Sequence, residues 1–112
     1  MRVPPSEGLL FTIQNLVCGS VKSTSSTSAC RSCIRGAGYV NLLFFAPSTM
    51  SSFLSYLKTN CFTSTYFDST ANTTGNKIIA CSTTNLATLG TTRSALRTNY
   101  NNFVSCLRTA TG

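Results

Sequence analysis

Apolar residues recur at helical spacing along most of this 112-residue chain. The clearest stripe consists of Met50, Phe53, Leu54, Leu57 and Cys61, at positions i, i+3, i+4, i+7 and i+11. This spacing places all five side chains on one face of an α-helix. We therefore predict a long amphipathic helix over this segment.

The two ends of the chain carry stripes of the same kind. Residues 9–17 predict a first helix, which Gly19 ends because glycine commonly follows a helix C-terminus. The last stripe predicts a helix over about residues 92–109, and its apolar members are Leu96, Tyr100, Phe103 and Leu107.

The stretch between the first and third stripes is ambiguous. We predict a helix that begins near Ser28 and continues to Pro47, with Ser48 capping the next helix. Gly36 and Gly38 interrupt it, and glycine can break a helix or allow close helix packing. The alternative is a helix that ends at these glycines, followed by a buried strand over residues 39–45. We favour the continuous helix because no other segment shows the alternation expected of a partner strand.

Two other segments are less regular. Residues 63–76 form a long polar loop in which Tyr66 and Phe67 can act as apolar plugs. Residues 77–89 contain several apolar side chains, but the polar run Ser82–Asn85 lowers helix propensity and predicts an interruption. We expect Gly90 to stop or kink this element.

Together these patterns predict an all-α fold. A chain of this length makes one domain, 1–112, and Pro4 and Pro5 predict an extended lead-in over residues 1–5. We expect a small, disulfide-stabilised bundle of four or five helices.

The composition is poor in charge and rich in Ser, Thr and Asn. Charged residues make up 10% of the chain, against about 25% in typical globular domains. Nine are Lys or Arg and two, Glu7 and Asp68, are acidic, which gives a net charge of +7. The basic residues are spread along the chain, as on an ordinary exposed surface. The alternative is that these charges bind an anionic surface, and the pattern argues against nucleic acid as the partner.

The six cysteines predict three disulfides, and hence an oxidising, extracellular setting. Cys30 and Cys33 form a C-x-x-C motif, which is also found in redox and zinc sites. A redox motif usually opens a helix after a strand, and a zinc site needs a second close pair. This chain offers neither, so we interpret all six as structural: Cys18, Cys30, Cys33, Cys61, Cys81 and Cys106.

Three further features bear on localisation. The apolar segment at residues 9–17 is too short and too interrupted for a signal peptide, so we expect a secreted chain to correspond to the mature form. No run reaches the about 18 apolar residues of a membrane span. Asn72 begins the triplet Asn72-Thr73-Thr74, which is a candidate N-glycosylation site.

The sequence argues against an enzyme. The chain has no histidine, so it has no imidazole base and no Ser-His or Cys-His pair. Glu7 and Asp68 are too few for most acid–base or hard-metal sites, and a glycosidase-type pair is the remote alternative. We predict no cofactor and no metal.

Three function classes therefore stay open. The favoured one is a non-catalytic secreted structural or interaction module that binds another extracellular protein or itself. The second is a membrane-active or anionic-surface-binding defence-type protein, suggested by the net charge of +7 and the amphipathic helices. The third is a carrier of a small apolar ligand, with candidate lining residues Phe44, Phe45, Phe53 and Phe103.

Self-association has its own candidate residues. Phe44 and Phe45 are adjacent, so a helix directs them about 100° apart and cannot bury both equally. Leu42 adds to an apolar surface larger than one small core requires. We predict that Leu42, Phe44 and Phe45 contribute to an interface, unless this segment is central and covered by the other helices.

Overall fold

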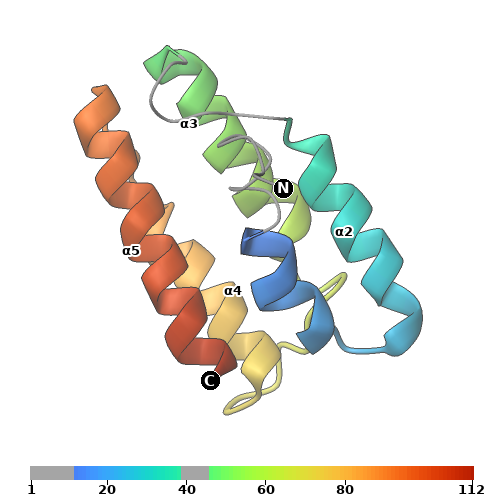
Figure 1. Cartoon of the computed structure of the whole chain (residues 1–112). Helices are drawn as coiled ribbons and strands as arrows, with labels where there is room; N and C mark the ends of the chain where they lie inside the picture. Colours follow the sequence, from blue (N-terminus) through green and yellow to red (C-terminus); the bar gives the residue numbers. More distant parts are fainter. Residues whose placement is uncertain (1–11, 39–45) are drawn as a thin grey trace, which may run out of the picture.

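The computed structural model describes residues 12–38 and 46–112, and these ranges contain helices and loops but no strand. The all-α prediction is therefore confirmed (Figure 1). After a helical turn at 12–17, the elements are the 3₁₀ turns η1 (Cys18–Ser20) and η2 (Thr24–Ser26), the helices α2 (Thr27–Gly36) and α3 (Pro47–Tyr56), the π-helical turn η3 (Leu57–Cys61), and the helices α4 (Thr74–Asn85) and α5 (Arg93–Thr111).

The packing contacts between helices fall into two groups. Helices α4 and α5 pack along each other as an antiparallel hairpin, and α5 also packs against α3. Helix α2 packs against η1, η2 and η3. In Figure 1, α5 and α2 lie at opposite sides of the view, and the blue segment that ends in η1 lies between them.

The predicted apolar stripes form the core. All five members of the stripe from Met50 to Cys61 are buried, and so are all four of the last helix. Phe67, one of the two loop plugs, is 1% exposed, and its ring stacks on Phe62 with centroids 5.9 Å apart. The largest fully buried side chains are Ile13, Ile34, Met50, Phe53, Leu54, Leu57, Phe67, Ile78, Leu86, Leu96, Phe103 and Leu107.

The third helix differs from the prediction at both ends. Ala46, not Ser48, is its N-cap residue, and Pro47 occupies the first turn, where its missing N–H is not needed. At the other end, the backbone N–H of Phe62 donates to the carbonyl of Leu57 over 3.0 Å, and the last turn widens into a π-helix. The predicted single helix is thus an α-helix followed by one π turn.

The predicted interruption at Ser82–Asn85 is wrong. These residues form the end of α4, which begins at Thr74 with the Thr73 hydroxyl accepting from the N–H of Asn76 over 3.1 Å. Ser82 is 1% exposed and shares the buried face with Ile78. Burial of this face against the rest of the protein outweighs the low helix propensity of the polar run.

The continuous helix predicted from Ser28 to Pro47 is also wrong. Helix α2 begins at Thr27 and ends at Gly36, and Gly38 has a φ of +99°, a left-handed conformation that glycine adopts without steric cost. Residues 39–45, where the strand was the alternative, lie outside the described ranges, as does the predicted lead-in at 1–5.

Candidate binding site

The disulfides join neighbouring elements of the fold. Cys18 pairs with Cys30, Cys33 with Cys61 and Cys81 with Cys106, with Cα separations of 5.6, 5.7 and 5.6 Å. The two cysteines of the C-x-x-C motif therefore bond to different partners, and the motif is neither a redox pair nor a zinc pair. All six cysteines are in disulfides, as predicted.

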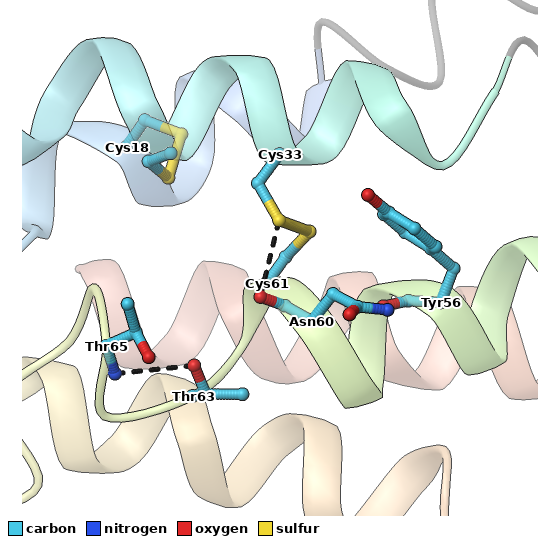
Figure 2. Close-up of a disulfide and its surroundings, with 8 residues drawn as sticks. Cys18, Cys33, Tyr56, Asn60, Cys61, Thr63 and Thr65 are labelled. Atoms are coloured by element: carbon cyan, nitrogen blue, oxygen red, sulfur yellow. Dashed lines mark hydrogen bonds between the residues drawn. A yellow bond between two sulfur atoms is a disulfide. The ribbon is translucent and has the colours of Figure 1, made fainter.

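Figure 2 shows how two of these bonds hold α2. Cys33 reaches from α2 to Cys61 in η3, while Cys30 bonds to Cys18 at the start of η1. The Cys33 Sγ lies 3.3 Å from the carbonyl oxygen of Asn60, a packing contact, because a disulfide sulfur carries no proton to donate. Tyr56 points from α3 toward α2, and its hydroxyl would lie 2.7 Å from a Cβ at Gly36. Gly36 therefore allows α2 to approach this side chain closely.

The third disulfide lies at a surface hollow between α4 and α5. The hollow has a volume of about 520 Å³. Cys81 is 3% exposed and Cys106 is half-buried, so the bond forms part of its wall. The seven lining residues are Lys77, Ala80, Cys81, Thr84, Cys106, Thr109 and Ala110.

Helical spacing explains this lining. On α4 the lining residues lie at i, i+3, i+4 and i+7, and on α5 they lie at i, i+3 and i+4. Each set is a single flank of its helix. Because the two helices are antiparallel, Lys77 near the start of α4 faces the same end of the hollow as Ala110 near the end of α5.

Charge is unevenly distributed over the described residues. Eight of them are Lys or Arg, and Asp68 is the one carboxylic acid side chain among them. Arg93, Arg97 and Arg108 are exposed and share one flank of α5, since they are separated by about 40° and 20° of helical rotation. Asp68 accepts a hydrogen bond from the N–H of Thr70 over 2.8 Å, and bonding to Thr70 lowers the pKa of this exposed carboxyl.

Burial strongly affects the phenol of Tyr100. It is 5% exposed, and burial raises its pKa to about 12, while the Arg108 charge works in the opposite direction. Tyr100 therefore stays protonated throughout the physiological range, as a core residue rather than an acid–base group.

The candidate glycosylation residue lies in an accessible place. Asn72 is exposed in the loop before α4, with a φ of 70°, and Thr74 of the triplet is also exposed. Thr73, between them, is the N-cap residue of α4. Glycosylation itself stays a prediction.

The candidate ligand-lining residues that the structure describes belong to the core. Phe53 and Phe103 are 1% and 0% exposed and belong to the packed core, and neither lines the hollow. Leu42, Phe44, Phe45 and Glu7 lie outside the described residues. In residues 12–38 and 46–112, no group of three or more His, Cys, Asp or Glu could hold a metal ion.

One structural residue had no signal in the sequence. The Asn99 side chain accepts from the N–H of Gly90 over 3.0 Å. It also donates to the carbonyls of Asn85 and Thr88 over 3.1 and 3.2 Å. These bonds attach the connection between α4 and α5 to α5, and they depend on a turn whose path the sequence pattern does not specify.

Comparisons with protein families, with curated proteins and with solved structures found no match to this chain. None of the helices in the described ranges combines the length and hydropathy that a membrane-spanning helix needs.

Proposed function

We propose that this chain is a secreted, non-catalytic interaction module that binds itself or another extracellular protein. The observation that carries the proposal is the pattern of cross-links. Each disulfide joins two different elements, so the helices are presented as a fixed frame. Such a frame limits the entropy lost on binding, which is the usual advantage of a preorganised binding surface.

The non-catalytic part of the proposal rests on the side chains available. The sequence has no histidine, and the described carboxylic acid side chain, Asp68, is exposed on a loop with a lowered pKa. A general acid or base needs a pKa near the working pH and a position beside a substrate. Asp68 has neither property.

Secretion is supported by three disulfides in a chain of 112 residues. The test is the intact mass of the protein isolated from its own cells and from their medium, with and without reduction. We expect the medium to contain the form whose mass increases by six hydrogen atoms on reduction, two for each disulfide. Reduced protein confined to the cells would contradict the proposal.

Self-association is tested by light scattering across concentration and salt. An apolar interface through Leu42, Phe44 and Phe45 predicts an oligomer that persists in high salt, because screening weakens charge contacts rather than apolar ones. Phe45→Ser should abolish the oligomer and keep the helical circular dichroism signal. Ala87→Ser, at an exposed loop position, is the matched control. A monomer under all conditions would contradict the proposed self-association.

An anionic surface is the second candidate partner, and the arginine row of α5 is the observation that favours it. Arg97→Gln combined with Arg108→Gln should weaken sedimentation with phosphatidylserine vesicles, and added salt should weaken it in the same way. Lys22→Gln is the control, since Lys22 lies outside α5 and its ammonium group donates to the carbonyl of Ser64. Binding that survives both the double substitution and high salt would count against this candidate.

A further inference from the structure

The hollow between α4 and α5 has apolar walls. Ala80 and Ala110 contribute methyl groups, and the Cys81–Cys106 disulfide contributes an apolar bridge between the helices. The Thr109 hydroxyl donates to the carbonyl of Ser105 over 3.2 Å, so its hydrogen-bonding capacity is used within its own helix. An apolar group placed here would therefore displace water from a surface that offers water few hydrogen bonds.

A single charge marks one end of the hollow. Lys77 is exposed, and its ammonium group makes no hydrogen bond or ion pair with the described part of the chain. No carboxylate belongs to the lining. The complementary ligand group at this end is therefore an anion, and a cation would be repelled.

The size of the hollow favours a small ligand over a protein. Seven residues line it, whereas a stable protein interface uses about 20–30 residues on each side. Its volume of about 520 Å³ lies within the range of about 300–1,000 Å³ that is typical of small-molecule sites.

The shape favours a linear ligand. The lining residues of α4 extend from Lys77 to Thr84, which is about 10 Å along a helix axis, and α5 runs alongside. The space between two antiparallel helices is a trough rather than a sphere, so a flexible chain can lie along it.

We propose that this hollow binds a free, single-chain carboxylate amphiphile such as a medium-chain fatty acid. The carboxylate pairs with Lys77, and the alkyl chain lies along the Cys81–Cys106 disulfide between Ala80 and Ala110. This inference goes beyond the proposed interaction module and does not depend on self-association, because none of the candidate interface residues belongs to the hollow.

The probe is decanoate at monomeric concentrations, added to the full ¹⁵N-labelled chain and followed by NMR. Saturable shifts should centre on Ala80, Thr84, Thr109 and Ala110. Nonyltrimethylammonium has the same nine-carbon alkyl tail and the opposite charge, and it should bind more weakly. Equal affinity for the two probes, or shifts centred elsewhere, would overturn the proposal.

Two substitutions test the head and the tail separately. Lys77→Gln should weaken decanoate binding about three- to fivefold, the scale of an exposed charge pair, and remove the preference over the cationic probe. Ala80→Phe should fill the hollow and abolish binding. Ala87→Phe, exposed and outside the hollow, should leave it unchanged, and circular dichroism checks the fold of each variant. Unchanged binding in both Lys77→Gln and Ala80→Phe would contradict the assignment.

The same samples separate this proposal from its alternatives. Light scattering reports the oligomeric state, so loss of self-association without loss of decanoate binding affects the proposed function alone. Binding to phosphatidylserine vesicles without binding of free decanoate would assign the surface to membranes and overturn the fatty-acid proposal.

Discussion

The two halves of the described chain hold their helices in place by different means. From residue 12 to Cys61 the helices are short: α2 and α3 have 10 residues each, and 3₁₀ and π turns adjoin them. Two of the three disulfides lie in this half. The α4–α5 hairpin has helices of 12 and 19 residues and one disulfide.

Capping shows the same contrast. Thr73 and Thr92 accept hydrogen bonds from the first turns of α4 and α5, over 3.1 Å in both cases, whereas α2 and α3 have no side-chain cap. Isolated helices shorter than about 12–15 residues are marginal in water. Covalent cross-links therefore compensate for low local helix stability in the first half, while caps and a long packed face stabilise the helices of the second.

The largest expected effect concerns the contact between α5 and Phe62, the first residue after the first half. Phe103 of α5 is fully buried, and its ring meets Phe62 edge to face with centroids 5.0 Å apart. Phe103→Ala should lower the free energy of unfolding by about 3–5 kcal/mol, because it leaves a cavity and removes this aromatic contact. Chemical denaturation measures the change. Asn102→Ala, exposed in the same turn, is the control, and an equal effect of both would contradict the assignment.

Removing one disulfide from each half tests the comparison directly. Loop closure predicts a loss of about 3 kcal/mol for either Cys18→Ala with Cys30→Ala or Cys81→Ala with Cys106→Ala, since the sequence separations are 12 and 25. The residues that lose hydrogen-exchange protection should differ between the two variants. We expect hydrogen exchange to show lost protection over residues 12–36 in the first pair and a retained α4–α5 hairpin in the second. Equal loss across both halves would refute the distinction.

Deprotonation of Tyr100 at high pH should lower the free energy of unfolding. Its folded-state pKa of about 12 lies above the about 10 of an unfolded tyrosine, so the stabilisation is complete below pH 10 and disappears as the pH rises toward 12. The loss should reach about 2–3 kcal/mol. Denaturation of the wild type and of Tyr100→Phe between pH 9 and 12 measures it. The free energy of unfolding of Tyr100→Phe should fall less between pH 9 and 12 than that of the wild type. An equal fall in the two proteins would contradict the prediction.

The smallest expected effect concerns the connection within the hairpin. Asn99→Ala removes one hydrogen bond to the last residue of α4 and two to the segment between α4 and α5, and we expect a loss of about 1–2 kcal/mol. Asn101→Ala, exposed on the same helix, should change stability by less than about 0.5 kcal/mol. If the two substitutions were equivalent in denaturation, the Asn99 bonds would contribute nothing to the hairpin.

The helical class and most of the core could be predicted from the amino-acid sequence. Apolar spacing identified the buried faces of α3 and α5, because a regular stripe has one amphipathic solution that buries it. Cysteine number and composition predicted a disulfide-stabilised bundle. These are local or compositional properties, and they need no knowledge of which helix packs on which.

Features that depend on how one helix packs against another could not be predicted from the sequence. Helix α4 continues through Ser82–Asn85 because its buried face packs on other elements, against the local preference of those residues. The choice of Cys18 for Cys30 and of Cys61 for Cys33 follows from where α2 lies. The hollow exists because pairing of α4 with α5 brings Lys77 beside Ala110, two positions that are separately ordinary on an exposed helix flank. Periodicity reports one element at a time, whereas bonds, caps and cavities form between elements.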